Sequence, residues 1–151
     1  MMVPIIMGSE RDKEFVKKIT TGLDEMGLLY KEYVASAHKT PELVLEIVEE
    51  YNNYNEPVCF ITVAGRSNGL SGVVAANSIH PVIACPPFKD RSDYLVNIHS
   101  TLQMPSETPV LTIVDPKNVS LAVARILGLT DKGVQDKIKK NIAEIKEGFR
   151  K

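Results

Sequence analysis

Three polar loops along this chain carry side chains that could bind an anion and move a proton. Residues 8–12 read GSERD, residues 36–40 read SAHKT, and residues 64–72 read AGRSNGLSG. Hydroxyls, backbone amides and guanidinium groups suit phosphate or carboxylate, and the imidazole of the second loop suits proton transfer near neutral pH. Together the loops indicate a small phosphorylated or carboxylated ligand and one acid–base group.

The first loop allows two interpretations. Ser9 and Asp12 have the spacing of a capping box at the start of a helix, which would account for both residues. A helix N-terminus with free amides, a serine hydroxyl and Arg11 is also a phosphate site. The spacing alone leaves both interpretations open.

His38 is the candidate for proton transfer. A lone histidine is more often a packed or solvated residue, but His38 lies at the end of a predicted strand and outside any apolar stripe. His80 precedes a proline on the way into a strand, and His99 lies in a predicted helix. We interpret His80 and His99 as structural or surface residues.

The third loop contains glycines at positions 65, 69 and 72, a spacing of Gly-x3-Gly-x2-Gly. It matches neither the dinucleotide-binding fingerprint nor a P-loop, which argues against bound NAD and against ATP hydrolysis. We expect exposed backbone N–H groups beside Ser67 that could bind an oxyanion or a carboxylate. A tight turn packed against the sheet is the alternative.

Alternating strand and helix patterns must position these loops. Thr40 and Asp115 each precede a proline and are expected to cap helices, and Gly27 and Gly128 are expected to end them. Several apolar runs are continuous, as in strands covered on both faces, so we expect an α/β fold, a three-layer doubly wound parallel sheet. A long C-terminal helix is expected over 131–151. The predicted strands are 3–7, 30–35, 58–63, 82–85 and 110–114.

Length and composition set the broad class. The 151 residues predict one domain, 1–151. The net charge of −1 indicates that the protein lacks the broad basic surface of most nucleic-acid-binding proteins. Cys59 and Cys85 lie inside apolar runs and are expected to be buried, reduced thiols, and no spacing suggests a metal site. No signal peptide or membrane span is apparent, so we expect a cytoplasmic protein with no membrane partner.

The order and spacing of the motifs resemble one family, the 5-aminoimidazole ribonucleotide (AIR) carboxylases of purine biosynthesis, with the related mutases that act on N-carboxyaminoimidazole ribonucleotide. The likeness runs from Ile5 to about Leu129. Its motifs are Met7-Gly8-Ser9 with Asp12, Ser36-Ala37-His38-Lys39-Thr40-Pro41, Ala64-Gly65, Pro81-Val82, Gln103-Met104-Pro105 and Asp115-Pro116.

Two branches of this family differ in sequence. The mutase branch has arginine after the loop histidine and a different third loop, whereas Lys39, residues 65–72 and residues 84–87 are similar to the branch that uses carbon dioxide directly. The resemblance implies reversible carboxylation of AIR without ATP, biotin, metal or other cofactor, on a flavodoxin-like fold. The mutase is the alternative, and a non-catalytic nucleotide-binding module is a more remote one.

The resemblance also implies roles for particular residues. His38 would remove the proton from the carboxylated ring carbon and return it during decarboxylation. The other implied roles are phosphate binding by Ser9 and Ser36, ribose binding by Asp12, positive charge from Lys39, and carbon dioxide binding by Ser67 and the Gly69 amide.

Two positions depart from the family pattern. Arg11 stands where a second serine is usual, so it could contact the phosphate or point into solvent. Glu107 stands where glycine is usual, although glycine adopts backbone angles that glutamate resists. The family also implies a homo-oligomer, an octamer, with the terminal helix available for a subunit contact.

Overall fold

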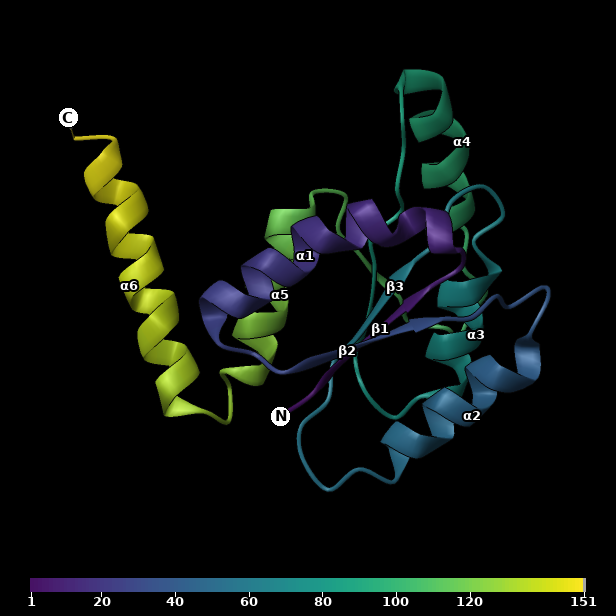
Figure 1. Cartoon of the computed structure of the whole chain (residues 1–151), viewed down its shortest axis with the longest axis horizontal. Helices are drawn as coiled ribbons and strands as arrows, with labels where there is room; N and C mark the ends of the chain where they lie inside the picture. The colour runs from purple at the N-terminus through teal and green to yellow at the C-terminus, as the bar shows by residue number, and fades with distance from the viewer. Residues whose placement is uncertain (151) are drawn as a thin grey trace.

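Five parallel strands form the centre of the computed structural model, which describes residues 1–150 (Figure 1). Their order across the sheet is β2-β1-β3-β4-β5. β2 is added on one side of β1, and β3, β4 and β5 are added on the other side, so the strand order switches between β1 and β3. Every residue of β1, β3 and β4 is buried, which confirms the interpretation of continuous apolar runs as central strands. The strands are β1 (Val3–Met7), β2 (Tyr30–Val34), β3 (Phe60–Val63), β4 (Val82–Ala84) and β5 (Leu111–Thr112).

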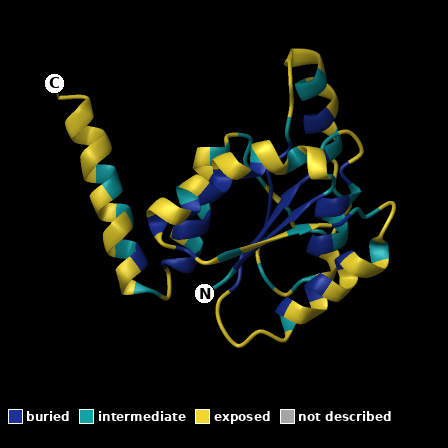
Figure 2. Ribbon diagram, in the orientation of Figure 1, coloured by how far each residue is buried: buried dark blue, intermediate teal, exposed yellow. Residues whose placement is uncertain are grey.

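Helices cover both faces of the sheet and complete the predicted three layers. α1 (Lys13–Met26) and α5 (Pro116–Leu127) bury their apolar stripes in one core with Ile5 and Ile61. α2 (Pro41–Asn52) and α3 (Gly69–Asn77) form the other core with Phe60. Because neighbouring strand residues point to opposite faces, β1, β3 and β4 each contribute buried side chains to both cores, and these strands are dark blue in Figure 2. The predicted α/β fold class is confirmed.

The predicted strand 3–7 is confirmed with its bounds, whereas the other four predicted strands extend one or two residues too far at an end, most clearly 110–114, which shortens to Leu111–Thr112. Backbone hydrogen bonds between strands continue one residue beyond the ends of β2 and β4. The amide of Ala35 donates to Met7 O at 3.0 Å, and the amide of Cys85 donates to Thr62 O at 2.9 Å. Residue 58 forms only an isolated bridge to Met2. The apolar runs therefore continue into the loops that leave the sheet.

The predicted N-terminal cap is confirmed for Asp115 and wrong for Thr40. Asp115 accepts from the amides of Lys117 and Asn118, as expected. Thr40 makes no cap bond, because its hydroxyl accepts from the Ser36 amide at 2.9 Å and so closes the 36–40 loop. Gly27 and Gly128 both end helices, but only Gly27 is left-handed, with φ of +65°.

The C-terminal helix α6 spans Lys132–Gly148, shorter than the predicted 131–151, and Lys151 lies outside the described residues. Asp131 caps it by accepting from the Val134 amide at 2.8 Å. Val134 is its one buried residue, and the rest of the helix stands away from the sheet (Figures 1 and 2). Within residues 1–150, no helix has the length and apolar content needed to cross a membrane.

Glu107 has the left-handed backbone that the glycine of the family pattern would accommodate, with φ of +64°. A left-handed L-residue costs about 1–2 kcal/mol, while glycine loses about 0.5–1 kcal/mol more conformational entropy on folding. We therefore expect Glu107→Gly to raise the free energy of unfolding by about 0.5–1 kcal/mol in urea titration. Glu107→Ala keeps the strain, so an equal gain in that variant would contradict this explanation.

Candidate active site

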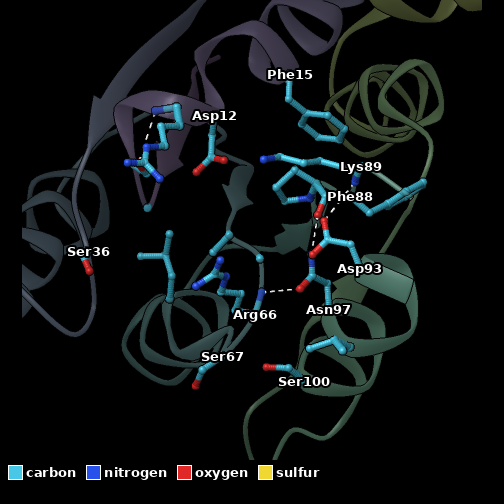
Figure 3. A pocket seen from close by; sticks show the side chains of 18 of the residues that line it. Asp12, Phe15, Ser36, Arg66, Ser67, Phe88, Lys89, Asp93, Asn97 and Ser100 are labelled. Carbon is cyan, nitrogen blue, oxygen red and sulfur yellow. Dashed lines mark hydrogen bonds between the residues drawn. The ribbon is translucent and has the colours of Figure 1, made fainter. Parts of the chain in front are cut away.

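The loops after β1, β2, β3 and β4 line one open cavity at the carboxyl edge of the sheet, about 1650 Å³ in volume (Figure 3). This is where ligands bind in doubly wound sheets, at the point where the strand order reverses. Of the predicted site residues, six line the cavity: Ser9, Arg11, Asp12, Ser36, His38 and Ser67.

The first loop resolves its two interpretations in part. The Ser9 hydroxyl accepts from the Arg11 amide at 3.3 Å, so serine caps the short 3-10 helix η1 (Glu10–Asp12). Asp12, the N-cap residue of α1, makes no side-chain hydrogen bond to that helix. Its carboxyl lines the cavity, and partial burial raises its pKa, an effect reduced by a hydrogen bond from the Ser9 backbone, which is the reciprocal contact of the predicted capping box. Asp12 is therefore available to a ligand.

The second loop presents His38 to the cavity and is held by its own side chains. The Ser36 hydroxyl accepts from the His38 amide at 3.3 Å, and the Thr40 hydroxyl donates to the Ser36 carbonyl at 3.3 Å. His38 is exposed within the cavity wall. A Cβ placed on Gly69 would lie 3.3 Å from both Cε1 and Nε2 of His38, so the imidazole packs on the first turn of α3. The topology thus brings His38 next to the third loop.

The third loop differs from expectation in its backbone. The amides of Arg66, Asn68 and Gly69 donate to Asn97 Oδ1 (2.5 Å), Ser100 Oγ (2.6 Å) and the Ser67 carbonyl (2.9 Å). The prediction of exposed N–H groups is therefore wrong for these three positions, since α4 (Arg91–Leu102) and the loop itself already bind them. The Ser67 side chain remains exposed to the cavity.

The positive charge of the cavity comes from residues other than Lys39. Lys39 is exposed and its side chain is not part of the cavity wall. Arg11, for which the sequence left both a phosphate contact and a solvent position open, lines the cavity, as do Lys18, Arg66 and Lys89. Lys18 comes from the second turn of α1, which begins at Lys13. Arg66 and Lys89 lie in loops, where no hydrophobic periodicity indicates which way a side chain points.

Aromatic side chains form a further part of the wall that sequence reasoning missed. Phe15 and Phe88 line the cavity, and the Phe88 ring packs edge-on against Tyr94 with centroids 5.2 Å apart. Such rings offer flat apolar surface to a heterocycle. Phe15 could have been read as core because it continues the apolar stripe of α1.

The remaining histidines and cysteines lie outside this site, as predicted. His80 is hydrogen-bonded to the Tyr51 carbonyl at 2.9 Å, and His99 is a surface residue. Burial raises the pKa of both Cys59 and Cys85 to about 12, so both thiols are protonated at neutral pH. Within residues 1–150, no three His, Cys, Asp or Glu side chains converge closely enough to hold a metal ion.

Comparison with known proteins agrees with this arrangement. The family model for AIR carboxylase matches residues 2–148. A phosphoribosylaminoimidazole carboxylase of Archaeoglobus fulgidus is 47% identical over 138 residues, 91% of this chain and 75% of the relative. The enzyme of the same name from Treponema denticola is 41% identical over 138 residues, 91% of this chain and 86% of the relative.

A solved structure supports the same assignment. The crystal structure of Treponema denticola PurE superposes with a TM-score of 0.92 at 37% identity, covering 98% of this chain and 93% of that one. The superposition therefore covers nearly the whole of both chains. The chain therefore belongs to the AIR carboxylase family.

Proposed function

We propose that this chain is an AIR carboxylase of purine biosynthesis, a carboxy-lyase that reversibly carboxylates 5-aminoimidazole ribonucleotide with carbon dioxide to 4-carboxy-5-aminoimidazole ribonucleotide. The names of the relatives and the family match support this activity over the alternatives. The observation that carries the mechanism is the packing of the His38 ring on Gly69, in the cavity wall shared with Ser67.

The ribonucleotide is held by the first two loops. Ser9 and Ser36 bind the phosphate, and Arg11 adds a guanidinium from the same wall. Asp12 accepts from the ribose hydroxyls. Because Lys39 does not line the cavity, the charge assigned to it by resemblance is supplied by Arg11 beside the phosphate and by Arg66 beside the carboxylate. These contacts place the aminoimidazole ring over the third loop.

The chemistry needs one nucleophilic carbon and one base. The enamine-like C4 of the aminoimidazole attacks carbon dioxide, and the new C–C bond leaves a non-aromatic intermediate that still carries hydrogen on C4. His38 takes this proton, and the C–H electron pair restores the aromatic ring. In the reverse direction the imidazolium protonates C4, the C–C bond breaks, and carbon dioxide leaves. Every step balances without an oxidant, reductant or nucleotide cofactor.

Carbon dioxide is small and nearly featureless, so positioning provides most of the rate. The Ser67 hydroxyl can donate to the developing carboxylate, and losing one such donor costs on the order of 10²–10³-fold in turnover in well-studied enzymes. The Gly69 amide already donates to the Ser67 carbonyl, so Gly69 contributes chiefly by having no side chain, which leaves room for the His38 ring.

The mutase and a non-catalytic binding module are separated from this proposal by one set of incubations. The protein is incubated with AIR and bicarbonate, with chelator and without ATP or biotin, and separately with the N-carboxy isomer, while ultraviolet absorbance is followed. Carboxylation of AIR supports the proposal. Conversion of the isomer alone would identify a mutase, and calorimetric binding of AIR without turnover would identify a binding module.

Asp12→Asn should lower the activity of the protein and raise its stability at pH 7. Because burial raises the pKa of Asp12 above its ordinary value of 3.8, the folded protein binds this proton more tightly than the unfolded chain. The free energy of unfolding therefore falls as the pH rises through the pKa of Asp12. At pH 7 the carboxylate is charged and the full loss of stability is present.

We accordingly expect Asp12→Asn to raise the melting temperature at pH 7 and to lose this advantage below about pH 3.5. The KM for AIR should rise by about 10–100-fold, because a hydrogen bond to a charged group is worth about 1.5–3 kcal/mol. Thermal melts over a pH series and initial rates check both effects. A lower melting temperature at pH 7 would contradict the burial argument.

We propose further that the chain acts in the cytoplasm as a homo-oligomer, an octamer by family analogy, with no membrane or nucleic-acid partner. Ile145 of α6, Phe149 directly after it and Leu95 of α4 are exposed, which supports contacts with other subunits. Sedimentation should show an oligomer at assay concentration, and a monomer would contradict this part of the proposal.

A further inference from the structure

We infer that Asn97 is a positioning residue for the carboxylation site, because its side-chain amide fixes two walls of the cavity at once. The inference rests on the proposed function and adds a residue from α4, an element to which the family motifs above assign no role. Asn97 is 3% exposed, and its buried side chain sits between the third loop and the loop after β4 (Figure 3).

Both ends of the Asn97 amide are used. Its Oδ1 accepts from the Arg66 amide at 2.5 Å, and its Nδ2 donates to the Pro87 carbonyl at 2.7 Å. An amide with one donor and one acceptor partner has a single satisfied orientation, since a flip would face N–H with N–H and C=O with C=O. Arg66 and Pro87 both line the cavity, so one side chain sets the distance between these two walls.

A polar stripe on α4 continues this attachment. Ser100 Oγ accepts from the Asn68 amide, and Thr101 Oγ1 accepts from Asn68 Nδ2 at 3.0 Å. Residues 97, 100 and 101 share one helix face. The only buried apolar side chain of α4 is Ile98, and it belongs to neither core. Hydrogen bonds therefore carry a large part of the contact that α4 makes with the site loop.

The hydrogen bonds from α4 hold a strained stretch of backbone in the third loop. Arg66 is left-handed, with φ of +56°, a conformation that costs about 1–2 kcal/mol in a residue with a side chain. A Cβ on Gly65 would lie 3.0 Å from Asn97 Nδ2, so a larger residue there would push the Asn97 amide away from its present position. The strained residue is thus held directly before Ser67, whose hydroxyl the proposed chemistry needs at a fixed place.

The test compares Asn97→Leu and Asn97→Asp with a matched control, Asn52→Leu. Asn52 makes the same kind of bridge, donating to the Asn77 carbonyl at 2.8 Å and accepting from the Ile79 amide at 3.1 Å, but its partners lie outside the cavity wall. All variants and the wild type are assayed with AIR and bicarbonate for kcat and KM, with melting temperatures measured in parallel.

Asn97→Leu should lower kcat by about 10²-fold while KM for AIR changes by less than about threefold, because the phosphate and ribose contacts lie on other loops. Asn97→Asp keeps the acceptor for Arg66 but loses the donor to Pro87, so its kcat should fall between those of the wild type and Asn97→Leu. Asn52→Leu should lose melting temperature yet keep kcat.

A kcat of Asn97→Leu within about threefold of the wild type would overturn the inference, as would an equal loss of kcat in Asn52→Leu. If Asn97→Leu does not fold, Asn97→Asp decides: lowered kcat at unchanged KM supports positioning, and unchanged kcat overturns it. A wild-type protein that does not carboxylate AIR would instead overturn the proposed function, and this inference with it.

Discussion

His38→Asn is expected to lower turnover of AIR with bicarbonate by about 10²–10⁴-fold, the usual contribution of a positioned acid–base group. Asparagine keeps much of the volume and polarity of histidine but cannot accept and return a proton. Because the His38 side chain is exposed in the cavity wall, its replacement should leave both cores intact. Initial rates by absorbance measure the loss.

Two controls separate chemistry from folding in this variant. Circular dichroism and the melting temperature should match the wild type, and calorimetric affinity for AIR should change little, since the proposed phosphate and ribose contacts come from other residues. Added imidazole should restore part of the rate, because the cavity is open. Retention of wild-type turnover by His38→Asn would show that another group moves the proton.

Gly69→Val is expected to lower kcat by about 10²-fold without lowering stability. A Cβ at this position already reaches 3.3 Å from Cε1 and Nε2 of His38, so the branched methyl groups of valine must displace the exposed ring. A shift of about 1 Å in a reacting group can cost about 10²-fold in rate. Gly69 begins α3, where any ordinary residue has better helix propensity than glycine.

A graded series tests this explanation. Gly69→Ala should displace the ring by a few tenths of an ångström and lose less activity than Gly69→Val. Gly148→Ala serves as control, because an added methyl at Gly148 meets open space. Kinetics and thermal melts on the three variants give the comparison. A Gly69→Val enzyme with wild-type kcat would contradict the contact between these loops.

The layered fold and the location of the cavity could be predicted because they depend on local pattern. Continuous apolar runs such as 3–7 and 58–63 can be buried on both faces only in a covered parallel sheet, and its carboxyl edge then gathers the following loops. The motif order in these loops predicted the AIR carboxylase family, which the comparisons confirm.

What the sequence could not supply are contacts between distant residues and the direction of loop side chains. Asn97 and Arg66 meet across 31 residues, and nothing in the pattern around either position indicates the other. The expectation of exposed third-loop amides is wrong at Arg66 and Asn68 because their acceptors belong to α4, which is about 30 residues away in the sequence. Thr40 illustrates a local failure, since its hydroxyl closes the preceding loop instead of capping α2.

Decarboxylation of the 4-carboxy nucleotide in deuterium oxide tests the central claim most directly. The imidazole of His38 exchanges with solvent, so the wild type should release AIR with one deuterium on C4 at an enzyme-catalysed rate. His38→Asn should release it no faster than the uncatalysed reaction, although it still binds the nucleotide. Release of deuterated AIR by His38→Asn at the wild-type rate would contradict the assignment of the proton to His38.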